Sequence, residues 1–441
     1  MPDASAAPAE QGGPAARALS LAKQGRFDEA GAILCRLVAE EFALEPVSLE
    51  ISRDGYSLNS VNGFLQTATG EDFFFKFHHE EGEEQTLKEF YQAELLRDAG
   101  YPVDAPVFAS RELGRQILLY KRRSTPRFAD LCRELDGATS DVDMAPALRA
   151  QADLDDLTAA IYRRTLHRAT DEEIAREPIH QLFHTRLIDP DRPDKLGGRA
   201  RRFFFDRDFD LAGTVISADE LRAARWIING VSYRQTLGEL LEKSRQVLAP
   251  ERLGRFGALV AHGDAHNANV WWEEEGGKPR LVLFDPAFAG SHVPAILAEV
   301  KATFHNILAH PAWLYHADEA AQRFGATVTY RDGVLDLRTD WRSSPLRQGF
   351  LRSKAERLWR PLLAEMSARD LLPDDWRQTL RSALFCCPTL VMDLAAGGTG
   401  RHNPVSSTIG LSVAIMAGSE PESGGKDLVS AFLDAVKPGR D

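Results

Sequence analysis

The sequence predicts an α+β protein in which an antiparallel β-sheet precedes a mostly helical region. Two observations support this prediction. Between residues 47 and 79, apolar and polar side chains alternate in short runs, a pattern typical of half-buried strands. Residues 125–260 instead place apolar side chains at helical spacing. We therefore expect the sheet and most of the helices to occupy different parts of the chain.

The composition is that of an ordinary globular protein. The chain has 441 residues, of which 44% are hydrophobic and 27% are charged. At roughly 150 residues per domain, this length predicts two to three structural units. The composition excludes a fully disordered, collagen-like or coiled-coil chain, and no segment approaches the ~18 consecutive apolar residues of a membrane helix.

Charge and cysteine content restrict the expected partners and compartment. The formal net charge is −12, which disfavours nucleic acid or an anionic membrane as the main partner. The first residues lack the basic flank and apolar core of a secretory signal. Because the four cysteines are too few for a disulfide framework, we expect reduced thiols and a cytoplasmic protein. These residues are Cys35, Cys132, Cys386 and Cys387.

Two segments precede the predicted sheet. Residues 1–14 are rich in Ala, Pro and Gly and predict a disordered tail. Residues 15–46 predict a helical hairpin, with one helix over 15–24 and a second over 28–44. A single hairpin cannot bury its own apolar face, so we expect it to pack on the main domain.

Residues 47–123 predict the sheet and one helix. Glycine-containing turns separate the first three strands, which are expected at 47–52, 61–68 and 72–79. A charged helix is expected over 83–100, and strands return up to residue 123.

Residues 124–441 predict the helical region. The clearest helices are expected over 147–169 and 218–248, with a polar loop at 189–202 between them. A β-hairpin is expected over 327–339, because Asp332-Gly333 is a typical tight-turn sequence.

The segment HGDAHNAN, residues 262–269, carries the strongest chemical signal. Asp264 and Asn269 lie on a predicted loop, and a second acid, Asp285, ends the apolar strand that follows. A hairpin between them would bring Asp285 back beside Asn269. Amide and carboxylate oxygens suit Mg²⁺, and Asp264 would remain to orient a hydroxyl group. This set of residues is suited to phosphoryl transfer.

The motif HGDAHNAN followed by FDPA resembles the HGDxHxxN…D signature of the aminoglycoside phosphotransferase/choline kinase-like family. The resemblance runs in order through roughly residues 47–310. It implies a bilobal protein-kinase-like fold and an ATP- and Mg²⁺-dependent kinase that phosphorylates a hydroxyl group of a small molecule. Asp264 would be the catalytic residue, and Asn269 and Asp285 would hold Mg²⁺.

The resemblance also implies a nucleotide site in the sheet region. Lys76, at the end of the strand FFFK, would contact the α- and β-phosphates of ATP. Glu89 on the next helix would pair with this lysine, and Glu94 is the alternative partner.

Further nucleotide-binding residues are expected by position. The loop 57–63 would cradle phosphates, with Ser60, Asn62 and Gly63 as its contributors. Leu119, Tyr120 and Lys121, at the start of the connection to the helical region, are candidates to line the adenine pocket.

The acceptor is expected to bind in the helical region. Candidate contacts are His266, His184, Arg186, Tyr233 and Asp393. The DPA form of the metal motif is similar to that of ketosamine-kinase-like members of the family, which weakens any transfer of aminoglycoside specificity. A sugar, an amino sugar, an amino alcohol or an antibiotic would fit the signature.

Two alternatives remain open. His262, Asp264 and His266 form an HxDxH pattern, which could be half of a transition-metal site in a hydrolase. The chain could also be a catalytically silent module that keeps the fold and binds nucleotide.

Overall fold

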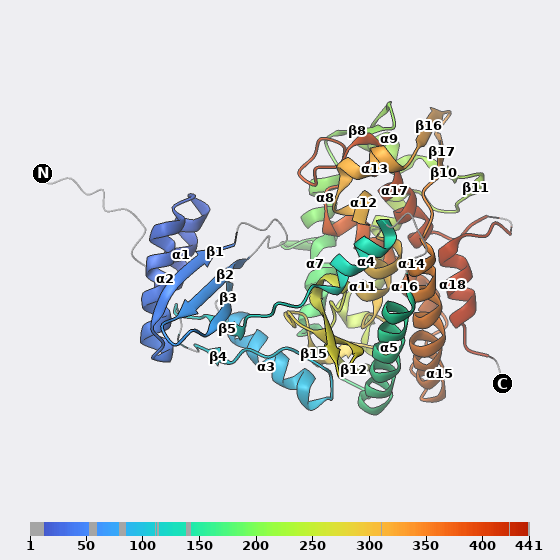
Figure 1. The fold of residues 1–441 in the computed structure, drawn as a ribbon. Coiled ribbons are helices and arrows are strands. Elements are labelled where there is room, and N and C mark those ends of the chain that lie inside the picture. Colours follow the sequence, from blue (N-terminus) through green and yellow to red (C-terminus); the bar gives the residue numbers. More distant parts are fainter. Residues whose placement is uncertain are drawn as a thin grey trace, which may run out of the picture. The chain divides into compact units, whose positions relative to one another are not determined.

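A computed structural model describes most of the chain in two compact units. The described residues are 13–52, 60–78, 85–110, 112, 114–137, 143–309, 311–422 and 424–439. Unit 1 contains the described residues up to Asp98, together with Pro102–Thr125 and Leu283–Ala287. Unit 2 contains Ala99–Tyr101, Pro126–Val282 and the chain from Phe288 onward. The predicted α+β class is confirmed, because the antiparallel sheet lies in unit 1 and most helices lie in unit 2 (Figure 1).

Unit 1 is built on a five-stranded antiparallel sheet with the order β1-β2-β3-β5-β4. Its strands are β1 (Pro46–Ile51), β2 (Ser60–Thr67), β3 (Asp72–His78), β4 (Phe108–Ala109) and β5 (Leu118–Lys121). Helix α3 (Gln85–Asp98) follows β3 and ends before Gly100, whose φ of +95° favours glycine. The expected strand, helix, strand order is therefore confirmed.

The predicted N-terminal hairpin is formed by α1 (Pro14–Lys23) and α2 (Phe27–Phe42), which pack on the sheet (Figure 1). The apolar side of the pair shares one core with Phe73, Phe75 and Leu119. Because side chains alternate along a strand, Lys76 lies on the opposite sheet face from Phe73 and Phe75. The hairpin thus covers the face of the sheet that does not carry Lys76.

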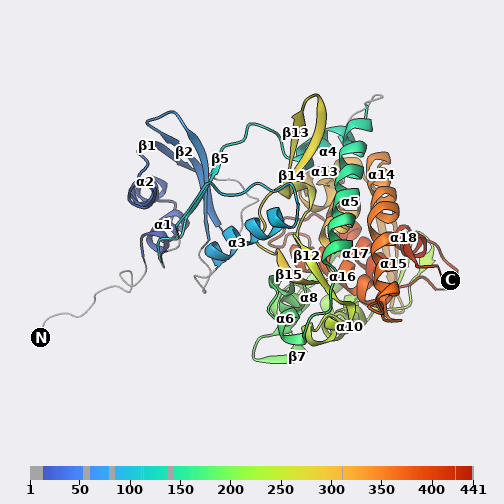
Figure 2. The same ribbon diagram turned by 90° about the horizontal axis from the view of Figure 1, so that it is seen from below.

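Unit 2 combines helices with short strands. Figure 2 shows its long helix α5 beside α14, which it contacts. The α-helices are α4 (Phe128–Gly137), α5 (Ala145–Thr165), α6 (Asp171–Ala175), α7 (His184–Leu187), α8 (Gly198–Phe204), α9 (Ala218–Ala223), α10 (Leu237–Val247), α11 (Val300–Thr303), α12 (Pro311–Leu314), α13 (Ala317–Arg323), α14 (Pro345–Ser353), α15 (Arg360–Ala368), α16 (Trp376–Val391), α17 (Pro404–Gly418) and α18 (Leu428–Val436).

Shorter helical turns connect these helices. They are η1 (Pro178–Leu182), η2 (Pro250–Arg252), η3 (Gly254–Phe256), η4 (Asn267–Asn269), η5 (Phe304–Leu308) and η6 (Lys354–Trp359). The last two are π-helical turns, which continue α11 and α14 respectively.

The remaining strands are arranged in one four-stranded sheet and four pairs. The larger sheet has the order β11-β10-β17-β16, from β10 (Arg225–Ile228), β11 (Val231–Ser232), β16 (Ala326–Arg331) and β17 (Val334–Thr339). The pairs are β6 (Ile188–Asp189) with β7 (Arg192–Leu196), β8 (Asp208–Leu211) with β9 (Thr214–Ser217), β12 (Ala258–Ala261) with β15 (Gly290–Pro294), and β13 (Val270–Glu275) with β14 (Lys278–Leu283). The hairpin expected over 327–339 is confirmed as β16 and β17.

The single helix expected over 218–248 is wrong. The structure divides this segment into α9, the hairpin β10–β11 and α10. Asn229 and Gly230 both have positive φ, which a helix interior does not allow. Capping boxes at Ser217 and Thr236 begin two separate helices.

The polar loop expected at 189–202 is also wrong. It forms strand β7, which pairs with β6, and helix α8. The side chains of β7 are mostly exposed and polar, because the small hairpin β6–β7 buries little of its surface. A strand of this kind has the composition of a loop, which is why the prediction failed.

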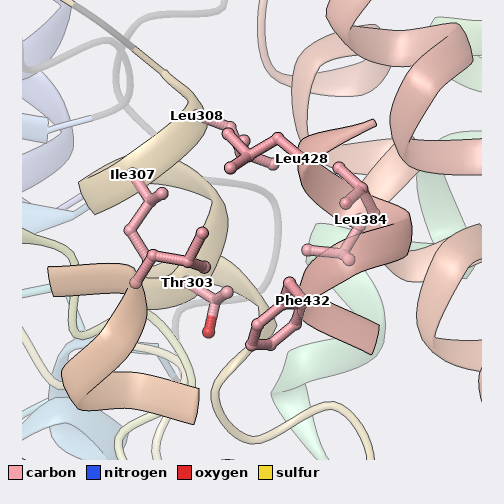
Figure 3. Close-up of a pocket in the computed structure, with 8 residues that line it drawn as sticks. Thr303, Ile307, Leu308, Leu384, Leu428 and Phe432 are labelled. Carbon is pink, nitrogen blue, oxygen red and sulfur yellow. The ribbon is translucent and has the colours of Figure 1, made fainter. Parts of the chain in front are cut away.

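The C-terminal helix α18 packs on the core of unit 2. Figure 3 shows Phe432 and Leu428 facing Thr303, Ile307 and Leu384 across a small cavity. Its volume of about 10 Å³ and its carbon lining leave no room for a ligand and no polar partners for water. Among the described residues, no helix is long and apolar enough to cross a membrane.

Candidate functional site

The loop that carries Asp264 lies between strands β12 and β13 in unit 2. It follows β12 directly, and β12 pairs antiparallel with β15. Gly263 allows the turn because its φ is +76°. A Cβ atom there would lie 2.6 Å from the carbonyl oxygen of Phe288, so only glycine fits.

Hydrogen bonds hold this loop in place from within and from outside. The backbone N–H of Asp264 donates to Nδ1 of His262 over 3.3 Å, and Nδ2 of Asn269 donates to the backbone oxygen of Asp264 over 3.0 Å. The backbone N–H of Asn267 donates to Oδ1 of Asn306 over 2.8 Å, which ties the loop to η5. The position of Asp264 is therefore fixed by its own loop and by a neighbouring helix.

The carboxylate of Asp264 is only 13% exposed. Its Oδ1 is buried and accepts no hydrogen bond from the described residues. Two basic groups lie 3.8 Å from this oxygen: Nζ of Lys301 and Nε2 of His266. An unsatisfied buried carboxylate oxygen is costly, so this atom is suited to accept a hydrogen bond from a ligand.

Lys301 begins a hydrogen-bonded chain behind Asp264. Its ammonium group donates to Nε2 of His305 over 2.9 Å, and Nδ1 of His305 lies 2.9 Å from the hydroxyl oxygen of Tyr315. Because an ammonium group can only donate, His305 is neutral and donates from Nδ1 to Tyr315. Burial also lowers the pKa of His305 well below its usual range, with a further contribution from Lys301. Sequence reasoning missed Lys301, although its spacing of four residues from His305 on a helix was a usable signal.

A buried ion cluster fixes the start of α11, which carries Lys301. Glu299 accepts hydrogen bonds from Lys354 over 2.6 Å and from the hydroxyl of Tyr162 over 2.8 Å. Lys354 also pairs with Asp155 over 2.9 Å. Burial opposes the charge of Lys354, but Asp155 and Glu299 outweigh it and raise the pKa of this lysine. The raised pKa keeps Lys354 protonated at neutral pH, and its hydrogen bond to Glu299 orients the start of the helix that carries Lys301.

In unit 1, Lys76 contacts Asp285. Nζ of Lys76 lies 2.5 Å from Oδ1 of Asp285, although 209 residues separate them in the chain. Leu283 brings Asp285 into unit 1 through hydrogen bonds with Pro102 and Asp104. Asp285 has a φ of +56°, which is unusual for a residue other than glycine and occurs often at functional sites.

The two expected Mg²⁺ ligands belong to different units, and each offers a free oxygen. Asn269 uses its amide nitrogen to donate to Asp264, which leaves its amide oxygen available. The second carboxylate oxygen of Asp285 has no hydrogen-bond partner among the described residues. An amide oxygen and a carboxylate oxygen are both donors that Mg²⁺ accepts, so each residue by itself has the chemistry of a ligand for the ion.

The described part of the expected loop 57–63 forms a strand instead of a loop, and its contact with phosphates stays a prediction. Asn62 and Gly63 lie inside strand β2, where they pair with Lys76 and Phe75 of β3. A Cβ on Gly63 would lie 1.9 Å from the carbonyl oxygen of Glu50, so this glycine allows β1 and β2 to approach closely. Ser60 also lies in β2, but its side chain and residues 57–59 are outside the described part.

The remaining candidates for nucleotide binding lie on helix α3 and strand β5 of unit 1. The side chain of Glu89 lies outside the described residues, and Glu94 accepts a hydrogen bond from Arg97 over 3.3 Å. Leu119 packs in the core beneath the helical pair. Tyr120 lies on the other sheet face, the face of Lys76, with its ring near Phe74.

The acceptor candidates of the helical region fall into two groups. Tyr233 donates to Asp427 over 3.2 Å, and Asp393 accepts two hydrogen bonds from Arg207 at 2.9 and 3.0 Å. These two residues therefore support the structure around them. His184 and Arg186 lie on α7, and Arg186 is close enough to Asp264 for the two charges to interact.

The hydrolase alternative gains no support from the described part of the chain. Among those residues, no group of three or more His, Cys, Asp or Glu side chains is placed to share a metal ion. His262 instead accepts a hydrogen bond within its own loop.

Comparison with known proteins gives distant structural likenesses only. No protein-family model matches the chain, and no curated protein sequence matches it. Among solved structures, the chain is similar to the macrolide 2′-phosphotransferase MphH from Brachybacterium faecium, with 12% identity, coverage of 94% of this chain and 99% of that one, and a TM-score of 0.36. A candidate fructosamine-3-kinase from Thermobifida fusca gives 14% identity, coverage of 86% and 98%, and a TM-score of 0.36.

The aminoglycoside phosphotransferase APH(2″)-IIIa, solved with GDP and kanamycin, gives 11% identity, coverage of 87% and 97%, and a TM-score of 0.38. These structural neighbours belong to the group of small-molecule kinases that the sequence motifs resemble. At such identities and TM-scores the likenesses carry no argument about what this chain binds, and the case for function rests on its residues.

Proposed function

We propose that this protein is a Mg²⁺-dependent kinase that transfers the γ-phosphate of ATP to a hydroxyl group of a small molecule. The contact between Lys76 and Asp285 is the observation that carries the proposal. The motifs assign these two residues to the phosphates and to the metal of one nucleotide, and they meet in unit 1 although they are far apart in sequence.

The reacting groups have a simple division of roles. Lys76 anchors the α- and β-phosphates of ATP, and Asn269 and Asp285 hold Mg²⁺. When bound, the ion neutralises negative charge that develops on the phosphate oxygens. Asp264 orients the acceptor hydroxyl group. The hydroxyl oxygen forms a bond to the γ-phosphorus, the bond from that phosphorus to the β-phosphate oxygen breaks, ADP leaves, and the hydroxyl proton passes to Asp264.

The buried, unsatisfied Oδ1 of Asp264 supports its role as the proton acceptor. This atom is suited to receive a hydrogen bond from a hydroxyl group, because the described residues supply none. A sugar, amino sugar, amino alcohol or antibiotic would provide such a group.

The substitution Asp264→Asn tests the proposal. It keeps the shape of the side chain but removes the proton acceptor. We expect ATP turnover with an acceptor to fall by roughly 10²- to 10⁴-fold, while MgATP binding by calorimetric titration stays within a few-fold of the wild type. Turnover at the wild-type rate in this variant would contradict the assignment. MgATP binding without transfer in the wild-type protein, across a broad acceptor panel, would favour the silent binding module.

A further inference from the structure

Three basic side chains of unit 2 interact electrostatically with one another, and two of them also interact with Asp264. They are Arg186 from α7, Arg199 from α8 and Lys301 from α11, which we call the basic cluster. Lys301 lies 3.8 Å from Asp264, and the charges of Arg186 and Arg199 both act on it. The charges of Arg199 and Asp264 in turn act on Arg186. The carboxylate of Asp264 thus interacts with two cations, and the third, Arg199, acts on both of these cations.

Two members of the basic cluster have partners within the protein. Lys301 lies against Asp264 and donates to His305. Arg199 donates to the carbonyl oxygens of Leu390 and Val391, over 2.9 and 3.1 Å, at the end of α16. Arg199 therefore satisfies the last carbonyl groups of that helix.

Arg186 differs from these two. In the described part of the chain, its guanidinium group makes no hydrogen bond and no ion pair. Burial and, to a lesser extent, the charge of Arg199 lower the pKa of Arg186 to about 10. A partly buried guanidinium group without a counter-anion is unfavourable, and its planar set of donors matches a carboxylate or a phosphate.

We propose that the acceptor molecule is anionic, and that Arg186 binds its carboxylate or phosphate group while Asp264 takes the proton of its hydroxyl group. The inference rests on the kinase function proposed above. Lys301 is a positioning residue in this arrangement, because it offsets the repulsion between Asp264 and an anionic acceptor. The same cations would repel a polycationic acceptor, so an aminoglycoside is disfavoured.

A first experiment measures anion binding at Arg186 without any need to know the acceptor. The protein is labelled with phenylglyoxal, which modifies arginine, in chloride, in acetate and in inorganic phosphate at equal ionic strength. Mass spectrometry then follows each arginine. Arg202, exposed on α8, is the internal control. We expect phosphate or acetate to slow labelling of Arg186 at least fivefold and to leave Arg202 unchanged. The anion that protects better distinguishes a phosphate from a carboxylate.

A second experiment uses the variants Arg186→Gln and Arg202→Gln. Because Arg186 has no partner to lose, we expect Arg186→Gln to be as stable to heat as the wild type or slightly more stable, whereas loss of a structural arginine would lower the melting temperature. We expect kcat/KM for an anionic acceptor to fall roughly 10- to 100-fold in Arg186→Gln, mainly through KM, and to stay unchanged in Arg202→Gln.

The outcomes separate this inference from the kinase proposal. Equal labelling of Arg186 in all three salts overturns the inference, and so does a neutral or cationic acceptor that is turned over faster than every hydroxy acid and sugar phosphate tested. MgATP binding would survive either result, so the kinase proposal would stand. Protection of Arg186 in a protein that fails to bind MgATP would instead overturn the kinase proposal and, with it, the acceptor role of this anion site.

Discussion

Gly63 lies where strands β1 and β2 approach too closely for a side chain. A Cβ atom there would meet the carbonyl oxygen of Glu50 at 1.9 Å and the ring of Phe75 at 2.8 Å. We expect Gly63→Ala to lower the free energy of unfolding by about 2 kcal/mol or more, because backbone must move to admit the methyl group. Urea unfolding without nucleotide measures this change.

Gly31 provides the matched control for Gly63. It lies in helix α2 of the same unit, and a Cβ there would meet only Leu49 at an ordinary 3.6 Å. Since alanine favours a helix, Gly31→Ala should raise stability by roughly 0.5–1 kcal/mol. If the two alanine variants were equally stable, Gly63 would not be held by the packing of the sheet.

Gly63 also shows why the strand conformation of residues 60–63 could not be predicted from the sequence. The sequence around it is rich in Ser, Asn and Gly, which is typical of loops. Pairing of Asn62 with Lys76 extends β2 through this segment instead. The sequence alone does not show that Gly63 is needed where two strands approach closely, because the contact with Glu50 is not local in the chain.

At the scale of elements, prediction succeeded where local signals agreed and failed where a turn lay inside an apolar run. The hairpin at 327–339 was predictable because Asp332-Gly333 separates two alternating segments. The structure of segment 218–248 was not predictable in this way. Its apolar residues Trp226, Ile227 and Ile228 fit a helical spacing with their neighbours, but they form a strand. This strand pairs in parallel with β17, more than 100 residues later in the chain. Parallel pairing at such a distance leaves no local signal.

The same limit applies to the candidate site. Asp264, Asn269, Asp285 and Lys76 could be named because a motif fixes their order and spacing. Lys301 could not be named, because it reaches Asp264 from a separate helix through tertiary packing.

The connection from α17 to α18 is held to α16 by Glu420. Its carboxylate accepts hydrogen bonds from Arg377 over 2.6 Å and from Arg381 over 2.8 Å. Burial raises the pKa of Glu420, but the bonds from the two arginines outweigh burial and lower the pKa from 4.5 to about 2. The stabilisation is therefore fully present above pH 4.5 and is lost as the pH falls towards 2.

We expect Glu420→Gln to reveal this dependence in urea unfolding between pH 7 and pH 2. The variant should be less stable than the wild type by about 1–2 kcal/mol above pH 4.5, a figure reduced for the partial exposure of the carboxylate. The difference should shrink as the pH approaches 2. Glu422→Gln, at an exposed position two residues later, serves as the control. A difference that does not change with pH would mean that Glu420 acts by packing alone.

At the scale of the whole molecule, the chain passes between its two units several times. Residues Leu283–Ala287 belong to unit 1, whereas Val282 and Phe288 on either side belong to unit 2. The contact between Lys76 and Asp285 therefore depends on a short segment that the chain contributes to unit 1 late in the sequence. For this reason we expect a ligand that bridges Lys76 and Asp285 to stabilise the folded state of the complete chain, and the complete chain is the form to test.

Thermal unfolding with MgATP provides that test. A ligand at about 100 times its Kd adds roughly 2.7 kcal/mol to the folded state, which for a chain of 441 residues corresponds to about 3 °C in Tm if the chain unfolds together. We expect this shift with MgATP and not with Mg²⁺ alone, ATP alone or Zn²⁺. MgGTP, measured in parallel, gives the nucleotide preference.

The variant Lys76→Met ties the shift to its proposed site. Removal of the ammonium group removes the proposed anchor of the α- and β-phosphates, so the MgATP shift should fall below 1 °C. Lys278→Met, at an exposed position on β14, should keep the shift. A full shift in Lys76→Met would move nucleotide binding away from the contact between Lys76 and Asp285. A shift with Zn²⁺ but not with MgATP would return the HxDxH loop to consideration as a metal site.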